Sequence, residues 1–277
     1  MTLYVVATPI GNLEDVTLRA LRVLGEVDLI AAEDTRRTRT LLARHGIARP
    51  LTSYYDAVER RRAPAIIERL KAGASVALVS DAGTPGIADP GYHLVRGALA
   101  AGVSVVPVPG PSALTALVSV AGFPAERFVF EGFLPSRAGP RAARLGALAR
   151  EPRALVFFEA ARRLGVFLAA AEAALGDREA ALGRELTKRH EEILRGRVSE
   201  LRERVERGAA QRGEVTVLVA GAPEAPPAYD EASIDDELRA GRAAGRGLRE
   251  LAAEIARRTG LSRREVYRRG LALERPG

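Results

Sequence analysis

The sequence predicts an α/β protein with two α/β domains and a small helical extension at its C-terminal end. Two observations support this fold class. Short apolar runs alternate with amphipathic segments up to residue 222, and the segment 234–277 holds helical patterns without a strand-like run. Strands that alternate with helices are typical of a mostly parallel sheet covered by helices. A length of 277 residues suffices for about two domains.

The first domain, residues 1–122, contains four strand-like apolar runs. A helical pattern follows each of the first runs, and each pattern ends on a glycine, as helices commonly do. Leu18, Leu21 and Leu24 share one face of the first helix, and Thr35 stands where the second helix needs its cap. The expected strands are 3–7, 29–32, 76–80 and 104–108, and the expected helices are 17–25, 35–46, 60–73 and 91–102.

The second domain, residues 123–222, precedes a Pro- and Ala-rich linker at 223–233 and the extension at 234–277. In the extension, Ser262 and Glu265 have the spacing of a capping box, and two helical patterns joined by a Gly-containing turn resemble a helix-turn-helix. The expected strands are 127–133, 153–160, 178–186, 190–198 and 213–221, and the expected helices are 161–175, 199–208, 248–260 and 261–273.

Composition excludes several classes of protein. The chain has no cysteine, so it has no disulfide, thiolate zinc site or cysteine nucleophile. Its three histidines lie far apart in the sequence, and we expect no metal. No apolar run approaches the ~20 residues that a membrane helix needs. The N-terminus begins as a strand without a basic segment, so we expect no signal peptide and a cytoplasmic location without a membrane partner.

The positive charge is concentrated at the C-terminal end. Residues 239–277 hold eleven arginines and four glutamates, which equals the net charge of +7 of the whole chain. A basic tail on a neutral body is typical of a protein with a polyanionic partner. A solvated, Arg-rich helix face in a chain that uses arginine throughout is the alternative.

Three loops rich in glycine and proline follow apolar strands, at 8–15, 80–91 and 107–116. Because the carboxyl ends of parallel strands lie on one edge of a sheet, we expect these loops to converge where open α/β sheets bind ligands. Such loops expose backbone groups, and the helix start near Gly110 and Ser112 favours an anion such as a carboxylate. The loops contain neither a P-loop nor a G-x-G-x-x-G motif. Simple tight turns are the alternative.

These segments resemble a known family. The sequences TPIGNLEDVTLRAL, AAEDTRRTRTLL, VALVSDAGTPGIADPGYHLV, VPVPGPSALTALV and GFLPSR are similar to the tetrapyrrole-methylase-like, S-adenosylmethionine-dependent methyltransferases, and within them to the branch that methylates ribosomal RNA. The resemblance implies a cofactor cleft between the two domains, 2′-O-methylation of a cytidine in the decoding region of small-subunit (16S) RNA, and a homodimer. The tetrapyrrole enzymes usually carry G-D-P where this chain has Gly83-Thr84-Pro85, which favours the RNA branch.

The resemblance also implies which residues bind S-adenosylmethionine. The second domain is expected to close over the adenine with Phe158, Glu159 and residues 215–217. The main cofactor pocket is expected to consist of Ile10, Gly11, Asp81, Ala82, Gly83, Thr84, Ile87, Pro109, Gly110, Ser112 and Ala113.

Two residues are candidates for taking the proton of the reacting hydroxyl. Asp34 follows a strand end, and Lys188 is one of only two lysines beside forty arginines. Lysine can deprotonate or act as a compact charge, which arginine cannot. The alternatives are a helix-capping charge for Asp34 and a surface or phosphate contact for Lys188.

The expected partner is 16S ribosomal RNA or the assembled small ribosomal subunit. Phosphate contacts are expected from Arg36, Arg37 and Arg39, and base stacking from Tyr54 beside Tyr55. Arg263, Arg264 and Arg268 are expected to contact RNA from the extension. A methyltransferase that acts on a small tetrapyrrole-like molecule and a non-catalytic RNA-binding module are the competing hypotheses.

Overall fold

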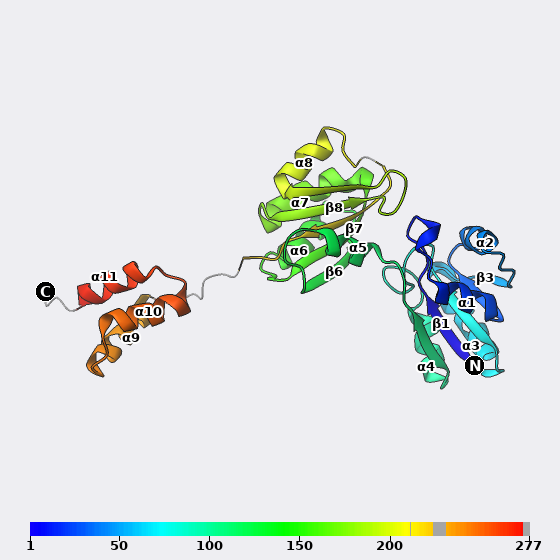
Figure 1. Ribbon diagram of the computed structural model, residues 1–277, viewed down its shortest axis with the longest axis horizontal. Helices are drawn as coiled ribbons and strands as arrows, with labels where there is room; N and C mark the ends of the chain where they lie inside the picture. Colours follow the sequence, from blue (N-terminus) through cyan, green and yellow to red (C-terminus); the bar gives the residue numbers. More distant parts are fainter. Residues whose placement is uncertain (211, 224–230, 274–277) are drawn as a thin grey trace. The chain divides into compact units, whose positions relative to one another are not determined.

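The computed structural model describes residues 1–210, 212–223 and 231–273. They fall into two compact units, Met1–Ala222 and Pro223–Gly277. The first unit contains two five-stranded sheets, and the second contains the helices α9, α10 and α11 (Figure 1). Among the described residues, no helix combines the length and the apolar character needed to cross a membrane.

The first sheet is entirely parallel, with strand order β3-β2-β4-β1-β5. The parallel arrangement follows from the helices that connect successive strands. It places the carboxyl ends of β4, β1 and β5 side by side. The strands are β1 (Thr2–Val6), β2 (Leu29–Ala32), β3 (Leu51–Ser53), β4 (Ser75–Val79) and β5 (Ser104–Val108).

Helices cover both faces of this sheet, because alternate residues of a strand point to opposite sides. In β2, Ile30 packs with residues of α1 and α2, whereas Ala31 packs with residues of α3 and α4. A buried isoleucine side chain such as that of Ile30 contributes about 1.5–3 kcal/mol. The helices are α1 (Leu18–Glu26), α2 (Thr35–Arg44), α3 (Asp56–Lys71) and α4 (Tyr92–Ala100).

Two local predictions for this sheet are wrong. Asp34, not Thr35, caps α2, and its carboxylate accepts the backbone N–H of Arg36 at 2.8 Å. Leu18 is the first residue of α1 and is 86% exposed, so it is not part of the buried face, which Val23 and Leu24 help to form.

The second sheet is mixed, with strand order β6-β7-β10-β8-β9 and parallel pairing only between β6 and β7. One face packs against α6, α7 and α8, and the other packs against α5. The strands are β6 (Phe128–Phe133), β7 (Ala154–Ala160), β8 (Glu179–Arg184), β9 (Glu192–Arg197) and β10 (Glu214–Val219). The helices are α5 (Ala113–Val120), α6 (Ala138–Ala147), α7 (Leu164–Leu175) and α8 (Val198–Glu206).

Ile10 joins the two halves of the first unit. It belongs to the loop after β1, yet it packs in the same core as Leu114 and Leu117 of α5 and Leu218 of β10. The loop ends of the first sheet therefore lie against the second sheet. The predicted boundary between residues 122 and 123 falls between α5 and β6 and stays a prediction.

The second unit is a three-helix cluster around a small apolar core. The backbone N–H of Glu265 donates to the Ser262 hydroxyl at 3.1 Å, as the capping motif predicts. The helices are α9 (Glu231–Ala243), α10 (Leu248–Thr259) and α11 (Arg263–Leu273). Helix α9 begins inside the predicted linker 223–233, and residues 224–230 of that linker lie outside the described residues.

Candidate active site

The three glycine- and proline-rich loops meet at the carboxyl edge of the first sheet, as predicted. Thr8 and Gly83 exchange two backbone hydrogen bonds, with N···O distances of 2.8 and 2.9 Å. The Thr8 hydroxyl also donates to the Ser80 carbonyl at 3.1 Å. Ala7, just before the first loop, donates its N–H to the Val108 carbonyl at 3.1 Å. These bonds tie the three loops together through backbone groups.

Glycine is required at the centre of this junction. Gly83 has a φ of +80°, a left-handed conformation that costs other residues roughly 1–2 kcal/mol. A Cβ on Gly83 would lie 3.6 Å from Cγ2 of Ile10 and 3.7 Å from the Pro111 carbonyl oxygen. The junction therefore holds all three loops within contact distance of one glycine.

A cavity of about 370 Å³ opens beside this junction, and a second cavity of about 340 Å³ shares part of its wall. Gly11 lines the second cavity, whereas Pro109 and Gly110 line neither of the two. The predicted cofactor residues that line the first cavity are Ile10, Asp81, Ala82, Gly83, Thr84, Ile87, Ser112 and Ala113.

The second sheet supplies the opposite wall of the first cavity. Phe158 and Glu159 at the end of β7 line it, together with Val215 and Thr216 of β10. Phe133 also lines the cavity and is 55% exposed, and its ring lies 5.7 Å from that of Phe158. The cavity wall therefore combines backbone-rich loops with an aromatic pair.

The loop between β8 and β9 closes against the loop after β1. The backbone N–H of Asn12 donates to the Thr187 hydroxyl at 3.0 Å. A Cβ on Gly11 would come within 2.3 Å of Cγ of Lys188, so this glycine allows the close approach of the two loops. Glu185 and Thr187 adopt left-handed backbone conformations, with φ values of 49° and 66°.

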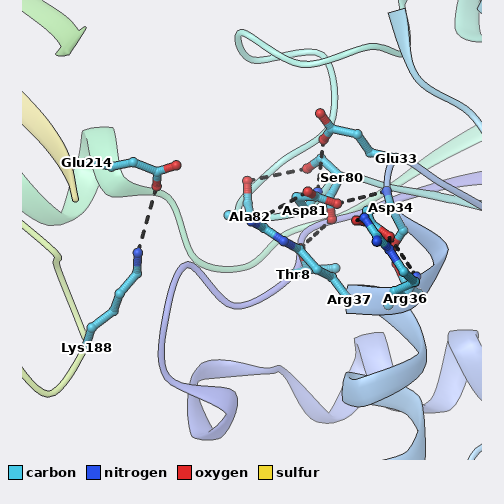
Figure 2. Close-up of polar contacts among 11 residues, drawn as sticks. Thr8, Glu33, Asp34, Arg36, Arg37, Ser80, Asp81, Ala82, Lys188 and Glu214 are labelled. Atoms are coloured by element: carbon cyan, nitrogen blue, oxygen red, sulfur yellow. Dashed lines mark hydrogen bonds and ion pairs between the residues drawn. The ribbon is translucent and has the colours of Figure 1, made fainter. Parts of the chain in front are cut away.

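A network of charged groups borders both cavities, and Figure 2 shows its members. Asp81 accepts the backbone N–H of Asp34 at 2.9 Å and pairs with the Arg37 guanidinium at 3.3 Å. The Asp81 N–H in turn donates to Glu33 at 3.1 Å. Burial raises the pKa of the Glu33 carboxyl above its ordinary value. Carboxylates from two strand ends are thereby fixed at the cavity wall.

Asp34 is held by its own helix rather than aimed at the cavity. Its carboxylate binds the Arg36 guanidinium as well as the N–H of Arg36, and these bonds lower the pKa of Asp34 to about 2. Asp34 is not among the residues that line either cavity. The structure thus shows the capping alternative for this residue.

Asp34→Asn should separate the cap from the charge, because asparagine caps a helix as well as aspartate does. The pKa of Asp34 is depressed, so its charge stabilises the folded protein above the ordinary pKa of 3.8 and ceases to do so as the pH falls towards 2. We expect the wild type to melt above the variant at pH 6, with a difference that shrinks below pH ~4. Thermal unfolding followed by circular dichroism measures it, and a constant difference across this range would contradict the assignment.

Lys188 lines both cavities, unlike Asp34. Its ammonium nitrogen lies 2.9 Å from Oε1 of Glu185 and 3.9 Å from Oε2 of Glu214, and Figure 2 shows the second contact. Its side chain is one-third exposed. Lys188 is therefore a cation at the boundary between the two cavities.

The residues predicted to contact RNA divide into two groups. Arg36, Arg37 and Arg39 are exposed on the first turns of α2, and Arg37 also lines both cavities. Arg263, Arg264 and Arg268 are exposed on α11. These positions are accessible to a polyanion, although phosphate contact itself stays a prediction.

The stacking role predicted for Tyr54 is wrong. Its side chain is fully buried in the core between the first sheet and α3, and burial raises the pKa of its hydroxyl. The chain leaves β3 in an extended conformation, so Tyr54 points inward and Tyr55, which is 43% exposed, points outward. A ring without exposed surface cannot stack on a base.

Sequence reasoning missed two features of the cavity wall. Asp89 lines the first cavity, and burial together with the negative charge of Glu33 raises its pKa to about 7. Phe133 stands at the cavity with an exposed ring. Asp89 was visible as one of two charges in an otherwise uncharged loop, whereas no sequence signal distinguishes Phe133 from a core residue of β6.

Among the described residues, no group of three or more histidine, aspartate or glutamate side chains is arranged to hold a metal ion.

Comparison with known proteins identifies the family. Residues 2–202 match the family of Tetrapyrrole (Corrin/Porphyrin) Methylases. The chain is 49% identical to the "Ribosomal RNA small subunit methyltransferase I" of Pseudomonas aeruginosa, across 100% of this chain and 98% of that protein. It is 50% identical to a protein of the same name from Thermotoga maritima, across 79% of this chain and 98% of that protein.

The fold is also similar to that of a solved structure. The crystal structure of uroporphyrin-III C-methyl transferase from Thermus thermophilus, complexed with S-adenyl homocysteine, matches with a TM-score of 0.56 and 23% identity. The match covers 78% of this chain and 96% of that one, and it shows the two-sheet fold. On the sequence matches and the shared fold, the chain belongs to the tetrapyrrole methylase family and, within it, to the ribosomal RNA small subunit methyltransferase I group.

Proposed function

We propose that this chain transfers a methyl group from S-adenosylmethionine to the ribose 2′-hydroxyl of a cytidine in the decoding region of 16S ribosomal RNA. The observation that carries the proposal is the cavity at which three loops with little side-chain bulk converge, in a chain whose relatives are named for small-subunit ribosomal RNA. The homodimer expected from the resemblance stays a prediction.

The residues at the cavity fit S-adenosylmethionine. Gly83 lines the cavity without a side chain, and Ser112 precedes α5, whose N-terminal N–H groups favour a carboxylate. Asp81 and Glu159 offer carboxylate oxygens for ribose hydroxyls or amino groups, and Phe158 offers an aromatic face for the adenine. When bound, S-adenosylmethionine supplies a methyl carbon already activated by its sulfonium. Related proteins include one solved with the demethylated product.

The main task of the protein is then orientation. Holding a hydroxyl in line with an activated carbon can supply roughly 7–11 kcal/mol of the barrier. The loops that build the cavity are tied to one another by backbone hydrogen bonds, so their positions are fixed before a ligand arrives. The arginines on α2 are suited to hold the phosphates that flank the reacting ribose.

Of the two residues predicted to be catalytic, Lys188 is the one at the cavity, and we assign it an electrostatic role. Its ammonium is paired with Glu185, so it acts as a compact cation that positions RNA at the boundary of the two cavities. Asp34 serves its helix and is not given a role in the reaction.

Lys188→Met should lower methyl-transfer turnover by tenfold or more, since a charge-assisted contact contributes about 1.5–3 kcal/mol. The affinity for S-adenosylhomocysteine should stay nearly unchanged, because the three loops do not depend on this ammonium. Single-turnover methylation of RNA and calorimetric binding of S-adenosylhomocysteine measure the two quantities. Arg69→Gln, on the exposed side of α3, is the control for loss of one positive charge. Turnover equal to that of the control would remove Lys188 from the site.

The proposed reaction is tested with methyl-labelled S-adenosylmethionine and three acceptors: small ribosomal subunits, naked 16S RNA and a tetrapyrrole. The RNA is digested to nucleosides, which are separated and identified by mass spectrometry. Label in 2′-O-methylcytidine is expected. Label in the tetrapyrrole alone would favour the small-molecule hypothesis, and cofactor-independent RNA binding without transfer would favour a non-catalytic module.

A further inference from the structure

Six carboxylates line the first cavity, and four of them lie within 4 Å of a cationic group. Asp81 pairs with Arg37 at 3.3 Å, and Glu159 pairs with Arg163 at 3.2 Å. The ammonium nitrogen of Lys188 lies 2.9 Å from the carboxylate of Glu185 and 3.9 Å from that of Glu214. The six are Glu33, Asp81, Asp89, Glu159, Glu185 and Glu214.

Asp89 and Glu33 are the two without an ion pair among the described residues. The carboxylate of Glu33 already has a hydrogen-bond partner within the protein, because it accepts the backbone N–H of Asp81. This bond holds the 80–91 loop against the end of β2. The Ser80 hydroxyl donates to the carbonyl oxygens of Ala82 and Gly83, and among the described residues no backbone N–H donates to the Asp89 carboxylate. Its carboxylate is therefore available to a ligand in the cavity.

The surroundings of Asp89 disfavour the charged form of its carboxyl group. The residue is half-buried, and the charged groups that face it are negative: Glu33 at the end of β2, Asp81 in its own loop, and Asp56 at the start of α3. Arg37, the cation in this part of the cavity wall, is paired with Asp81. Burial first, and then these charges, raise the pKa of Asp89 to about 7, the range in which a carboxylate exchanges protons at neutral pH.

A ribose hydroxyl must lose its proton as it is methylated, and the proposed function leaves the acceptor of that proton open. Asp34 lies outside the cavity lining, and the ammonium of Lys188 has no lone pair to offer. Asp89 lines the cavity on the same loop as Asp81 and Gly83, which are expected to touch the methyl donor.

We propose that Asp89 is the general base that accepts the 2′-hydroxyl proton of the RNA, an inference that rests on the proposed function. A bond forms between the 2′-oxygen and the methyl carbon while the bond between that carbon and sulfur breaks. The sulfur keeps the electron pair of the broken bond and becomes a neutral thioether. The hydroxyl proton moves to a carboxylate oxygen of Asp89, which later releases it to water.

Asp89→Asn tests the inference, because it keeps the shape of the side chain and removes its basicity. Single-turnover methyl transfer to 16S RNA, at saturating cofactor and between pH 5.5 and 9, should fall by ~10²–10⁴-fold. In the wild type the rate should rise as the pH increases through about 7 and then level off, and the variant should lose this rise. The calorimetric affinity for S-adenosylhomocysteine should be retained. Asp89→Glu should restore part of the rate, and Glu68→Gln on the surface of α3 is the charge control.

Thermal unfolding of the unliganded protein gives a second result that does not depend on activity. The raised pKa means that the charged form of Asp89 costs stability, and this cost is absent below the ordinary pKa of 3.8 and complete above about 7. The melting temperature of Asp89→Asn relative to wild type should therefore rise from pH 5 to pH 8. A carboxylate with an ordinary pKa would leave this difference constant.

The outcomes separate the two proposals. Loss of turnover and of the pH dependence, with retained cofactor affinity and the expected melting behaviour, supports Asp89 as the base. A variant that matches the Glu68→Gln control in rate and pH profile, while the wild type methylates ribose, overturns the role of Asp89 and leaves the proposed function intact. A wild type that puts no label on any ribose overturns the proposed function and, with it, this inference.

Discussion

Replacing Gly83 with valine is expected to weaken the binding of S-adenosylhomocysteine by about 100-fold, a loss of ~3 kcal/mol of binding free energy. Two physical effects combine. The φ of +80° disfavours a β-branched residue, and the added methyl groups would stand between Ile10 and Pro111, at the point where the three loops meet. A Cβ alone would make ordinary contacts there, so we expect the methyl groups beyond it, together with the backbone strain, to displace the loops and change the shape of the cavity.

The control for this substitution is Gly102→Val. Gly102 follows α4 with a φ of +71° and has no atom within 4 Å of a built Cβ, so it shares the backbone strain without the cavity. Both variants should melt below the wild type, and only Gly83→Val should lose affinity in isothermal titration calorimetry. Equal affinity of Gly83→Val and Gly102→Val would show that the ligand does not lie at the loop junction.

Neutralising Arg263, Arg264 and Arg268 together is expected to weaken binding to a 16S RNA fragment by tenfold or more at low salt. Each phosphate contact that is lost removes a released counterion, so the slope of log K against log salt should become shallower by about 2–3. These arginines are exposed on α11, whereas Val266 between them is buried in the core of the helical unit. Substitution by glutamine should therefore leave that core intact.

Measuring the affinity for S-adenosylhomocysteine distinguishes a specific loss of RNA binding from a general loss of folded structure. The triple variant should bind S-adenosylhomocysteine as the wild type does, because these arginines belong to a separate compact unit. The match to the Thermotoga maritima relative covers 98% of that protein but only 79% of this chain, so a member of the family can be shorter than this chain. The control replaces Arg150, Arg204 and Arg212, which are exposed in the first unit, with glutamine. Equal loss of RNA affinity in both triple variants would indicate nonspecific charge attraction.

The loop junction was predictable from sequence because it follows from a simple rule of parallel sheets. In the first sheet the strands alternate with helices and run parallel, so glycine- and proline-rich segments at their carboxyl ends share an edge. The loops at 80–91 and 8–15 were therefore expected to converge, whereas the pairing of Thr8 with Gly83 comes from the structure.

Other features depend on contacts that a linear pattern does not show. Helix α6 contains Gly139 and Pro140 near its start, so its sequence resembles a loop, and it forms because Leu145 packs beneath it. Tyr54 and Tyr55 differ in burial only because the chain leaves β3 extended. The approach of Lys188 to Gly11 joins the loop between β8 and β9 of the second sheet to the loop after β1 of the first.

The proposed proton acceptor, Asp89, also could not be recognised from the sequence pattern alone. Asp89 was visible in the sequence, but its raised pKa arises first from burial and then from the negative charges of Glu33, Asp81 and Asp56, and of these three only Asp81 belongs to the same loop. Asp34 looked equally acidic in the sequence, yet its position before a helix gives it a cap and an arginine partner. Environment, not residue type, separates these two aspartates.

The most direct test of the central claim is a crystal structure of the chain with S-adenosylhomocysteine bound. Difference density for the ligand is expected in the cavity beside Gly83, with its carboxylate near the start of α5 and its adenine towards Phe158. Density at another surface, or an ordered ligand that leaves this cavity filled only by water, would contradict the account.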